Sequence, residues 1–315
     1  MSSNGLPDAA RGARAVEVEA QAKVNLRLRI LARETTGYHQ LETLLLRLAL
    51  SDTVRVRRTT AVRSLDAVGD GDISALGPPD RNLAWRAAEA YFAASGMDGG
   101  FAIEITKRIP VGGGLGGGSA DAGAVLRALD AMADTPLGSP SLLDIAAQLG
   151  ADVPFLASEH AYALAWGRGA RMLALTPPPS RATLLIVPAF GVETTAAYGW
   201  LADSRSGPDA AGDIGAVALD LEALTDWDRL ALLTENDFER VVATRYPVIA
   251  EHVAALRNLG CVVAMLSGSG STVFGVARAD ALEFAAMARA PMPAAEARYI
   301  ETRTARRVEP VSVIE

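Results

Sequence analysis

The sequence predicts an α+β fold in two halves, and three observations support this. Apolar and polar side chains alternate from residue 16 to residue 30, which is typical of a β-strand with one buried face. Further strand and helix patterns follow along the 315 residues, without the strict alternation of a doubly wound sheet. Three consecutive prolines, Pro177 to Pro179, mark a hinge between the halves.

The two halves are expected at residues 16–178 and 179–315. In the first, we predict strands at 16–30, 52–58 and 101–106, and helices at 83–94, 119–132 and 142–149, with Asn82 and Ser141 as caps. In the second, we predict strands at 181–189, 261–266 and 272–277, and helices at 226–234, 247–259 and 279–289, with a loop at 203–215. A last strand near 297–313 is expected to return to the first half. Residues 1–15 lack the apolar core of a secretory signal and are expected to form a disordered tail.

Bulk composition excludes several classes of protein. Hydrophobic residues make up 50% and charged residues 21%, a balance typical of globular proteins. The net charge is −7 and no basic block stands out, so nucleic acid is not an expected partner. No apolar run reaches the roughly 18–20 residues that span a bilayer, so no membrane partner is expected. The single cysteine, Cys261, excludes an internal disulfide, and a cytoplasmic location is therefore the default expectation. We further expect a monomer or a weak homodimer.

A glycine-rich segment follows the predicted strand at 101–106. Residues 112–118 hold six glycines and one leucine, at a backbone entropy cost of roughly 0.5–1 kcal/mol each relative to alanine. Because the segment leads into a predicted helix, free N–H groups and the positive end of the helix dipole converge there. This arrangement predicts a phosphate-binding loop. The candidate ATP-binding residues are Pro110, Val111, Gly112, Gly113, Gly114, Leu115, Gly116, Gly117, Gly118, Ser119 and Ala120.

Two common phosphate loops do not fit this segment. A Walker A loop requires a lysine after the last glycine, and here Gly118 is followed by Ser119. The spacing of Gly112, Gly114 and Gly117 matches a dinucleotide fingerprint, but that motif requires a following strand that ends in an acidic residue. The pattern here continues with helix, proline break and helix. The segment closely resembles the phosphate loop of the GHMP kinases.

Phosphoryl transfer to an alcohol requires a carboxylate that accepts the hydroxyl proton. Asp152 is the candidate, since Gly150 and Pro154 hold it in a short constrained segment; its spacing alone equally fits a turn aspartate. Lys23 and Asn25 share the polar face of the first strand, about 6.8 Å apart. Lys23 is positioned to orient Asp152 and to offset charge on the phosphoryl group, although a solvated sheet face is the alternative for both residues.

Six motifs in order extend the resemblance to nearly the whole chain. They are residues 22–26 (Ala-Lys-Val-Asn-Leu), 37–39 (Gly-Tyr-His), the glycine loop, 150–154 (Gly-Ala-Asp-Val-Pro), 236–239 (Asn-Asp-Phe-Glu) and 267–271 (Ser-Gly-Ser-Gly-Ser). The set resembles the branch of the GHMP kinases that phosphorylates 4-diphosphocytidyl-2-C-methyl-D-erythritol on its 2-hydroxyl in isoprenoid biosynthesis. The resemblance implies ATP with Mg²⁺, an N-terminal lobe like ribosomal protein S5 domain 2, and a ferredoxin-like C-terminal lobe.

The resemblance also implies residue roles. Lys23 and Asp152 correspond to the catalytic pair, with Asp152 as the base and Asn25 beside them. Tyr38 and His39 correspond to residues that bind the cytosine end of the substrate, a role that suits an aromatic face and a histidine edge. Tyr198 is the candidate for a second stacking aromatic. Without the resemblance, Tyr38 and His39 read as a loop aromatic and a surface histidine.

Several points stay open from the sequence. Ala120 and Ala170 stand where the family often has a serine and an acidic residue. Gly268 and Ser269 either bind substrate phosphates through their N–H groups or form only a tight turn. The alternatives for function are another GHMP kinase, acting on a sugar, homoserine or a mevalonate-type alcohol, and a non-catalytic nucleotide-binding regulator.

Overall fold

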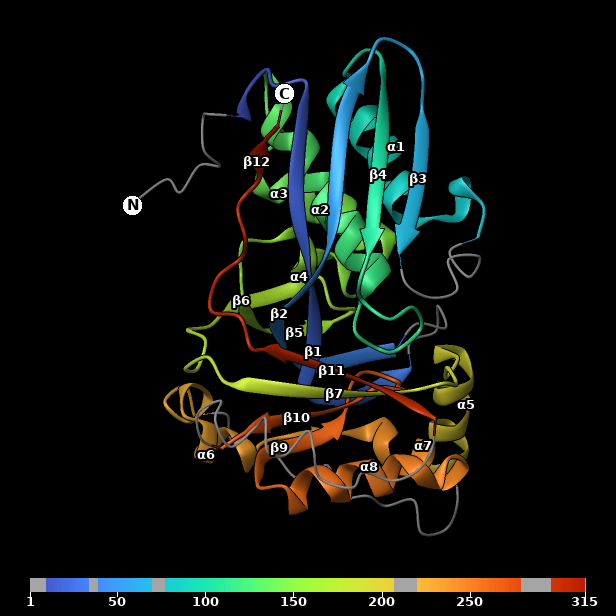
Figure 1. Cartoon of the computed structure of the whole chain (residues 1–315), viewed down its shortest axis with the longest axis vertical. Helices are drawn as coiled ribbons and strands as arrows, with labels where there is room; N and C mark the ends of the chain where they lie inside the picture. The colour runs from blue at the N-terminus through green and yellow to red at the C-terminus, as the bar shows by residue number, and fades with distance from the viewer. Residues whose placement is uncertain (1–9, 34–38, 70–76, 207–219, 279–295, 315) are drawn as a thin grey trace.

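The computed structural model describes residues 10–33, 39–69, 77–206, 220–278 and 296–314. Two sheets organise the chain, and Figure 1 shows the strands of the second running across the lower end of the first. The first sheet has the order β12-β1-β2-β4-β3, with β5 paired to β2, β6 to β5 and β8 to β1. Its strands are β1 (Ala15–Arg33), β2 (His39–Thr59), β3 (Ser64–Gly69), β4 (Gly100–Lys107), β5 (Tyr162–Gly167), β6 (Arg171–Ala174), β8 (Glu235–Asn236) and β12 (Ser312–Val313).

Helices cover one face of the first sheet. They are α1 (Leu83–Ser95), α2 (Gly117–Met132), α3 (Ser139–Leu149) and α4 (Val153–Ala157), with the short 3-10 turn η3 (Pro79–Arg81) before α1. Asn82 caps α1 as expected, since its side chain accepts a hydrogen bond from the N–H of Ala84. In α2 every side chain from Ala120 to Met132 is buried, because this helix lies between the sheet and its neighbouring helices.

The second sheet is antiparallel, in the order β11-β7-β10-β9. Its strands are β7 (Ala182–Pro188), β9 (Cys261–Leu266), β10 (Val273–Ala277) and β11 (Ala297–Arg303). The other elements of this part are α5 (Thr194–Ser204), η4 (Ala223–Thr225), α6 (Trp227–Ala231), α7 (Asp237–Arg245) and α8 (Pro247–Asn258). Leu185 packs in the core of the first lobe, whereas Leu184 and Ile186 pack in a second core with α5, α7 and α8. Burial on both faces explains why this strand is apolar except at Thr183.

The alternation in β1 is confirmed, but the interpretation of its polar face is only half right. The apolar residues at 16–30 are buried, and Glu17 and Glu19 on the other face are partly exposed. Farther along that face, Lys23, Asn25 and Arg27 are also buried. The reason is tertiary: Lys23 contacts the glycine loop, and Arg27 contacts Leu233 and Glu235. An alternation pattern reports side-chain polarity and not what packs against that face.

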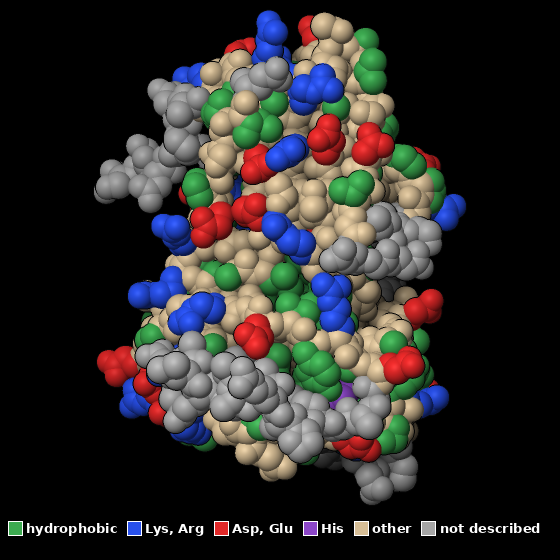
Figure 2. Space-filling view, in the orientation of Figure 1, with side chains coloured by type: hydrophobic (Ala, Val, Ile, Leu, Met, Phe, Trp, Pro, Cys, Tyr) green, Lys and Arg blue, Asp and Glu red, His purple; other side chains and the backbone are tan. Residues whose placement is uncertain are grey.

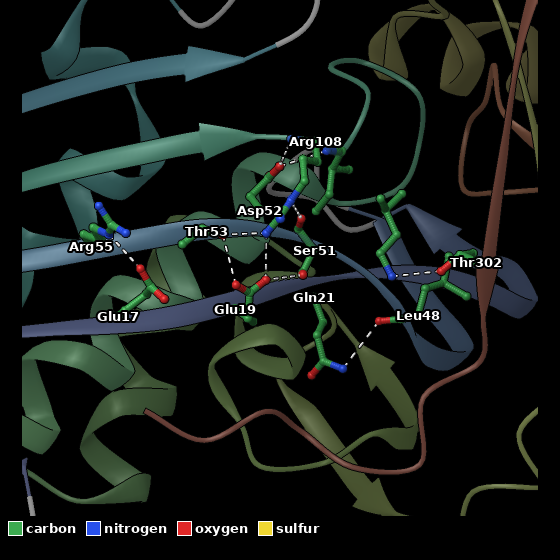
Figure 3. A network of polar contacts seen from close by, with 12 residues as sticks. Glu17, Glu19, Gln21, Leu48, Ser51, Asp52, Thr53, Arg55, Arg108 and Thr302 are labelled. Carbon is green, nitrogen blue, oxygen red and sulfur yellow. Dashed lines mark hydrogen bonds and ion pairs between the residues drawn. The ribbon is translucent and has the colours of Figure 1, made fainter. Parts of the chain in front are cut away.

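The exposed part of the first sheet carries a polar network. Figure 3 shows Glu19 on β1 accepting hydrogen bonds from Ser51, Thr53 and Arg108. These contacts join β1, β2 and the segment that follows β4. On the face seen in Figure 2, positive and negative side chains lie intermixed.

The chain returns to the first lobe after β11. The N–H of Ala305 donates to the carbonyl of Arg47, and Gln21 bonds the backbone of both Arg307 and Glu309. β12 then pairs with the start of β1, so the two ends of the described chain lie together in Figure 1.

Two predicted elements lie largely outside the described residues, and the predicted N-terminal tail is partly ordered. The helix expected at 279–289 and most of the loop at 203–215 lie outside the described residues. Residues 10–14, within the expected tail, contact α2: Ala10 is buried, and the N–H of Gly12 donates to Met132. Among the helices that the structure describes, none combines the length and the apolar character that a membrane span requires.

Candidate functional site

A cavity of about 360 Å³ opens where the glycine loop, β1, α4, α5 and the 267–271 loop meet. Most of the residues singled out in the sequence line it. They are Lys23, Asn25, Pro110, Gly112, Gly113, Gly114, Leu115, Gly116, Gly117, Gly118, Ser119, Asp152, Tyr198, Gly268 and Ser269. Residues more than 100 positions apart in the chain therefore face one space.

The glycine loop has the backbone conformation that its composition predicts. Gly112, Gly114 and Gly116 have φ values of 74°, 79° and 74°, which side-chain-bearing residues rarely adopt. Gly116 is the N-cap of α2, and the helix begins at Gly117. The first N–H groups of α2 lack intrahelical acceptors, so this end of the cavity favours an anion such as phosphate.

The second glycine-rich loop holds the first in place. The hydroxyl of Ser267 donates to the carbonyl of Gly114 at 3.0 Å, and the N–H of Thr272 donates to the carbonyl of Gly113 at 3.2 Å. Asn236 bonds the carbonyls of Leu266 and Gly268 from the other side. The 267–271 segment is thus a turn between β9 and β10 and also part of the cavity wall.

Gly114→Ala is expected to destabilise the contact between the two loops. A β-carbon on Gly114 would lie 2.2 Å from the carbonyl oxygen of Ser267, whereas one on Gly112 would meet nothing within 4 Å. Both variants carry the strain of a positive φ, on the order of 1–3 kcal/mol. Gly114→Ala adds overpacking of roughly 1–3 kcal/mol. Urea unfolding of Gly114→Ala and Gly112→Ala measures this difference. Equal losses of unfolding free energy in the two variants would show that the added β-carbon of Gly114→Ala does not clash with Ser267.

Lys23 and Asp152 are in contact in the cavity. Lys23 Nζ lies 3.2 Å from Asp152 Oδ2, 2.8 Å from Asn25 Oδ1 and 3.1 Å from the carbonyl oxygen of Gly114. The lysine side chain is only 3% exposed, whereas the aspartate is 33% exposed. The Lys23 ammonium group, which contacts three oxygen atoms, thus holds the Asp152 carboxylate at the surface of the cavity.

The orientation of Asn25 follows from a chain of hydrogen bonds. Its Oδ1 accepts from Lys23, its Nδ2 donates to Thr43 Oγ1 at 2.9 Å, and that hydroxyl donates to the carbonyl of Arg27 at 2.7 Å. Thr43 also lines the cavity. Sequence reasoning missed this residue, since a threonine in an apolar strand carries no signal until the pairing of β1 with β2, in which Thr43 lies opposite Leu28, brings it within hydrogen-bond distance of Asn25.

One end of the cavity is lined by the aromatic rings of Tyr198 and Phe238, whereas His39 is not among the lining residues. His39, at the start of β2, stacks on Tyr198 of α5 with ring centroids 4.3 Å apart and an interplanar angle of 20°. Phe238 meets the same tyrosine edge-on at 4.9 Å. Burial, with a contribution from the charge of Asp152, raises the pKa of Tyr198 to about 12. Tyr38 lies outside the described residues.

A buried charged cluster lies beneath the glycine loop. Lys107, at the end of β4, contacts the carboxylates of Asp52 and Asp121, and all three residues are buried. Asp52 also accepts hydrogen bonds from the N–H groups of Arg108 and Ile109, at 2.5 and 2.8 Å. Burial raises the pKa of Asp121 to about 7, with Asp52 adding to the shift and Lys107 opposing it. The cluster joins the strand before the loop to the helix after it.

Two of the predicted ATP-binding residues, Val111 and Ala120, do not line the cavity. Val111 is 48% exposed. Ala120 is buried in the core, and its N–H donates to the carbonyl of Gly116. Conversely, Phe238, Thr194 and Leu83 line the cavity without having been predicted to bind anything. Among the described residues, no group of three or more His, Cys, Asp and Glu side chains is arranged to hold a metal ion.

Family models match both lobes. The GHMP kinase N-terminal domain matches residues 82–160, and the GHMP kinase C-terminal domain matches residues 218–294. The first match contains the glycine loop and Asp152, and the two-lobe α+β prediction is confirmed.

Individual proteins give a closer comparison. The chain is 36% identical over 263 residues to 4-diphosphocytidyl-2-C-methyl-D-erythritol kinase of Geobacter sp. (strain M21), covering 83% of this chain and 89% of the relative. It is 37% identical over 285 residues to the enzyme of the same name from Pelotomaculum thermopropionicum, covering 90% and 96%.

Solved structures agree with these matches. A crystal structure of 4-(cytidine 5'-diphospho)-2C-methyl-D-erythritol kinase superposes with a TM-score of 0.69 at 33% identity, covering 91% of this chain and 98% of that one. Mevalonate kinase of L. major, in complex with R-mevalonate, has the same TM-score at 14% identity, covering 95% and 98%, and so shares the fold.

Proposed function

This chain belongs to the 4-diphosphocytidyl-2-C-methyl-D-erythritol kinases of the GHMP kinase family, and we propose that it transfers the γ-phosphoryl group of ATP to the 2-hydroxyl of that cytidyl alcohol. The products are ADP and the 2-phosphate, an intermediate in isoprenoid precursor biosynthesis. The observation that supports the proposal most directly is the 3.2 Å contact between Lys23 Nζ and Asp152 Oδ2, in a cavity that also contains the start of α2.

The proposed chemistry divides between the two members of this pair. Asp152 is the more exposed, and its carboxylate accepts the proton of the substrate hydroxyl as the oxygen attacks the γ-phosphorus. The bond from the γ-phosphorus to the bridging oxygen breaks, and ADP leaves. Lys23 orients the carboxylate and offsets negative charge on the migrating phosphoryl group. Asn25 and Thr43 hold the ammonium group in place.

We assign the nucleotide phosphates to the glycine loop. The N–H groups at the start of α2 provide donors, and the hydroxyl of Ser119 adds a side-chain contact. The proposed Mg²⁺ fits this site with mainly phosphate and water ligands, since hard cations of this size retain water and take few protein oxygens. We propose Ser119, at the start of α2 and in the lining of the cavity, as the protein oxygen that would contact it.

The cytosine end of the substrate is assigned to the aromatic end of the cavity. Tyr198 and His39 offer a stacked ring pair, and the imidazole edge adds hydrogen-bonding groups. We include Tyr38, its sequence neighbour, in the same role. We assign the diphosphate to the backbone N–H groups of Gly268 and Ser269, which line the same cavity, since the Ser269 hydroxyl lies 3.1 Å from that of Thr194 on the helix that carries Tyr198.

A substrate panel tests the proposed activity. The purified protein, with ATP and Mg²⁺, is incubated separately with the cytidyl alcohol, homoserine, mevalonate and galactose. ADP release and the phosphorus NMR spectrum of the product are then measured. We expect turnover of the cytidyl alcohol alone. Turnover of a small alcohol instead would assign the chain to another GHMP activity, and ATP binding without any transfer would make it a regulator.

Tyr198→Ala is expected to weaken substrate binding at the cytosine end. Loss of one stacking ring costs about 1–3 kcal/mol, which raises the KM for the cytidyl alcohol by roughly 5- to 150-fold. The KM for ATP should change little, because the glycine loop is untouched. Tyr198→Phe keeps the ring and serves as the matched control, with a KM near that of the parent. If both variants bound the substrate as the parent does, the cytosine ring would have to bind at another place.

A further inference from the structure

Arg47 is a fully buried cation in the middle of β2. The residue is 1% exposed, and burial lowers the pKa of its guanidinium well below the usual value, with the charge of Arg127 adding to this effect. Within the described residues, its side chain donates hydrogen bonds to carbonyl oxygens rather than to carboxylates. Burying a charge in this way is costly unless the group is fully hydrogen-bonded. The reason for burying this charge must therefore lie in the groups that the Arg47 guanidinium binds.

Those carbonyls belong to one short segment, the end of α4 and the turn after it. Arg47 Nη2 lies 2.9 Å from the carbonyl oxygen of Phe155, 3.0 Å from that of Leu156 and 2.9 Å from that of Ser158. Nε donates to the carbonyl of His160 at 3.0 Å. The last carbonyls of a helix lack intrahelical donors, so a cation at this position satisfies them. The guanidinium also lies 5.1 Å from the ring centroid of Phe155.

The other end of the same helix carries Asp152. This residue is the N-cap of α4, and its carbonyl accepts from the N–H of Leu156 at 3.1 Å. α4 has only five residues, so its two ends are one turn apart. A displacement at the carbonyl end is therefore expected to move the aspartate as well.

The strand register places the two cations side by side. Lys23 on β1 is paired with Arg47 on β2, and directly opposite residues in an antiparallel pair point to the same face of the sheet. Lys23 contacts Asp152 at the start of α4, and Arg47 contacts the carbonyls at its end. We infer that Arg47 is a positioning residue for Asp152, which fixes α4 at its carboxyl end so that the carboxylate stays in line with the acceptor hydroxyl. This inference rests on the role given to Asp152 in the proposed function.

Kinetics of Arg47→Met, compared with a matched buried arginine, test the inference. Arg127 on α2 is 3% exposed and donates to the carbonyl of Glu309 at 2.6 Å, so Arg127→Met also removes a buried cation bonded to a carbonyl. We expect Arg47→Met to lower kcat by roughly 10- to 100-fold with both KM values within about twofold, because the general base is misplaced. Arg127→Met should keep kcat near that of the parent. Arg47→Lys retains the charge and three donors and should recover part of kcat.

Equal kcat losses in the two methionine variants would overturn the inference, as would KM values that rise as much as kcat falls. Arg47→Lys against the parent supplies the same comparison if Arg47→Met does not fold. Amide hydrogen exchange in residues 153–158, measured without substrate, separates this test from that of the proposed activity. Exchange there should be faster in Arg47→Met than in Arg127→Met, and equal rates would overturn the inference whatever alcohol the enzyme accepts.

Discussion

Asp152→Asn is expected to lower kcat by about 10²- to 10⁴-fold, the usual contribution of a positioned general base. Asparagine has nearly the shape of aspartate, and its amide oxygen still accepts a hydrogen bond from Lys23 Nζ, which lies 3.2 Å from the carboxylate. What is lost is the capacity to accept a proton. The KM for ATP should stay close to that of the parent, since the glycine loop does not change. Steady-state release of ADP with the cytidyl alcohol measures both constants.

Two further variants make this result specific. Asp144→Asn changes an exposed carboxylate on α3 and should leave kcat unaffected. Lys23→Met should also reduce kcat severely, and the double variant should be little worse than either single one, because the pair acts as a unit. Full activity in Asp152→Asn would show that another group accepts the proton. Strictly multiplicative losses would show that the two residues act independently.

Lys107→Met is expected to lower the free energy of unfolding by about 3–5 kcal/mol, the usual cost of breaking a buried ion pair. The lysine is the cation between Asp52 and Asp121, both of which are buried. Its removal leaves two carboxylates facing each other in the interior. It also frees the segment before the glycine loop, so ATP should bind more weakly. Urea unfolding and calorimetry with ATP measure the two effects.

The pH dependence of this loss has a definite sign. Burial already raises the pKa of Asp121 to about 7, and Lys107 opposes that rise. Without the lysine, the pKa of Asp121 in the folded protein rises further, so folding is disfavoured more strongly as the pH passes 7. The deficit of Lys107→Met should therefore be larger at pH 8 than at pH 6. Lys107→Met with Asp121→Asn should recover part of the loss.

The exposed pair Arg63 and Glu89 provides the control for this stability measurement. Their contact is 2.6 Å, but both side chains are 38% exposed. Arg63→Met should cost no more than about 1 kcal/mol, as is usual for surface ion pairs. A Lys107→Met variant as stable as Arg63→Met would contradict the role given to the buried cluster.

Local patterns in the sequence predicted the fold class and most of the strands. β9 begins and ends where expected, and α2 and α8 differ by two residues or fewer, because their periodicity and their glycine or proline boundaries are strong. α7 and the hairpin of β5 and β6 were not predicted. Both are short, and the mean hydropathy of α7 is low, so their positions depend on what they pack against.

The candidate site shows a similar division. Glycine density pointed to a phosphate loop, and ordered motifs pointed to Lys23, Asn25 and Asp152, which the structure brings together. Thr43 and Arg47 carry no local signal. They matter only through the pairing of β1 with β2, which sets Lys23 opposite Arg47 and Asn25 near Thr43. Long-range register is the information that a single sequence lacks.

The return of the chain to its own first strand has a consequence for synthesis on the ribosome. β1 pairs with β12, Gln21 bonds the backbone of Arg307 and Glu309, and Arg127 of α2 bonds Glu309. The glycine loop likewise takes hydrogen bonds from residues 267 and 272. A nascent chain that stops after the first lobe lacks all of these contacts. The glycine loop can therefore gain its partners only after residues 267–272 have been synthesised, and the first sheet its last strand only after residues 312–313.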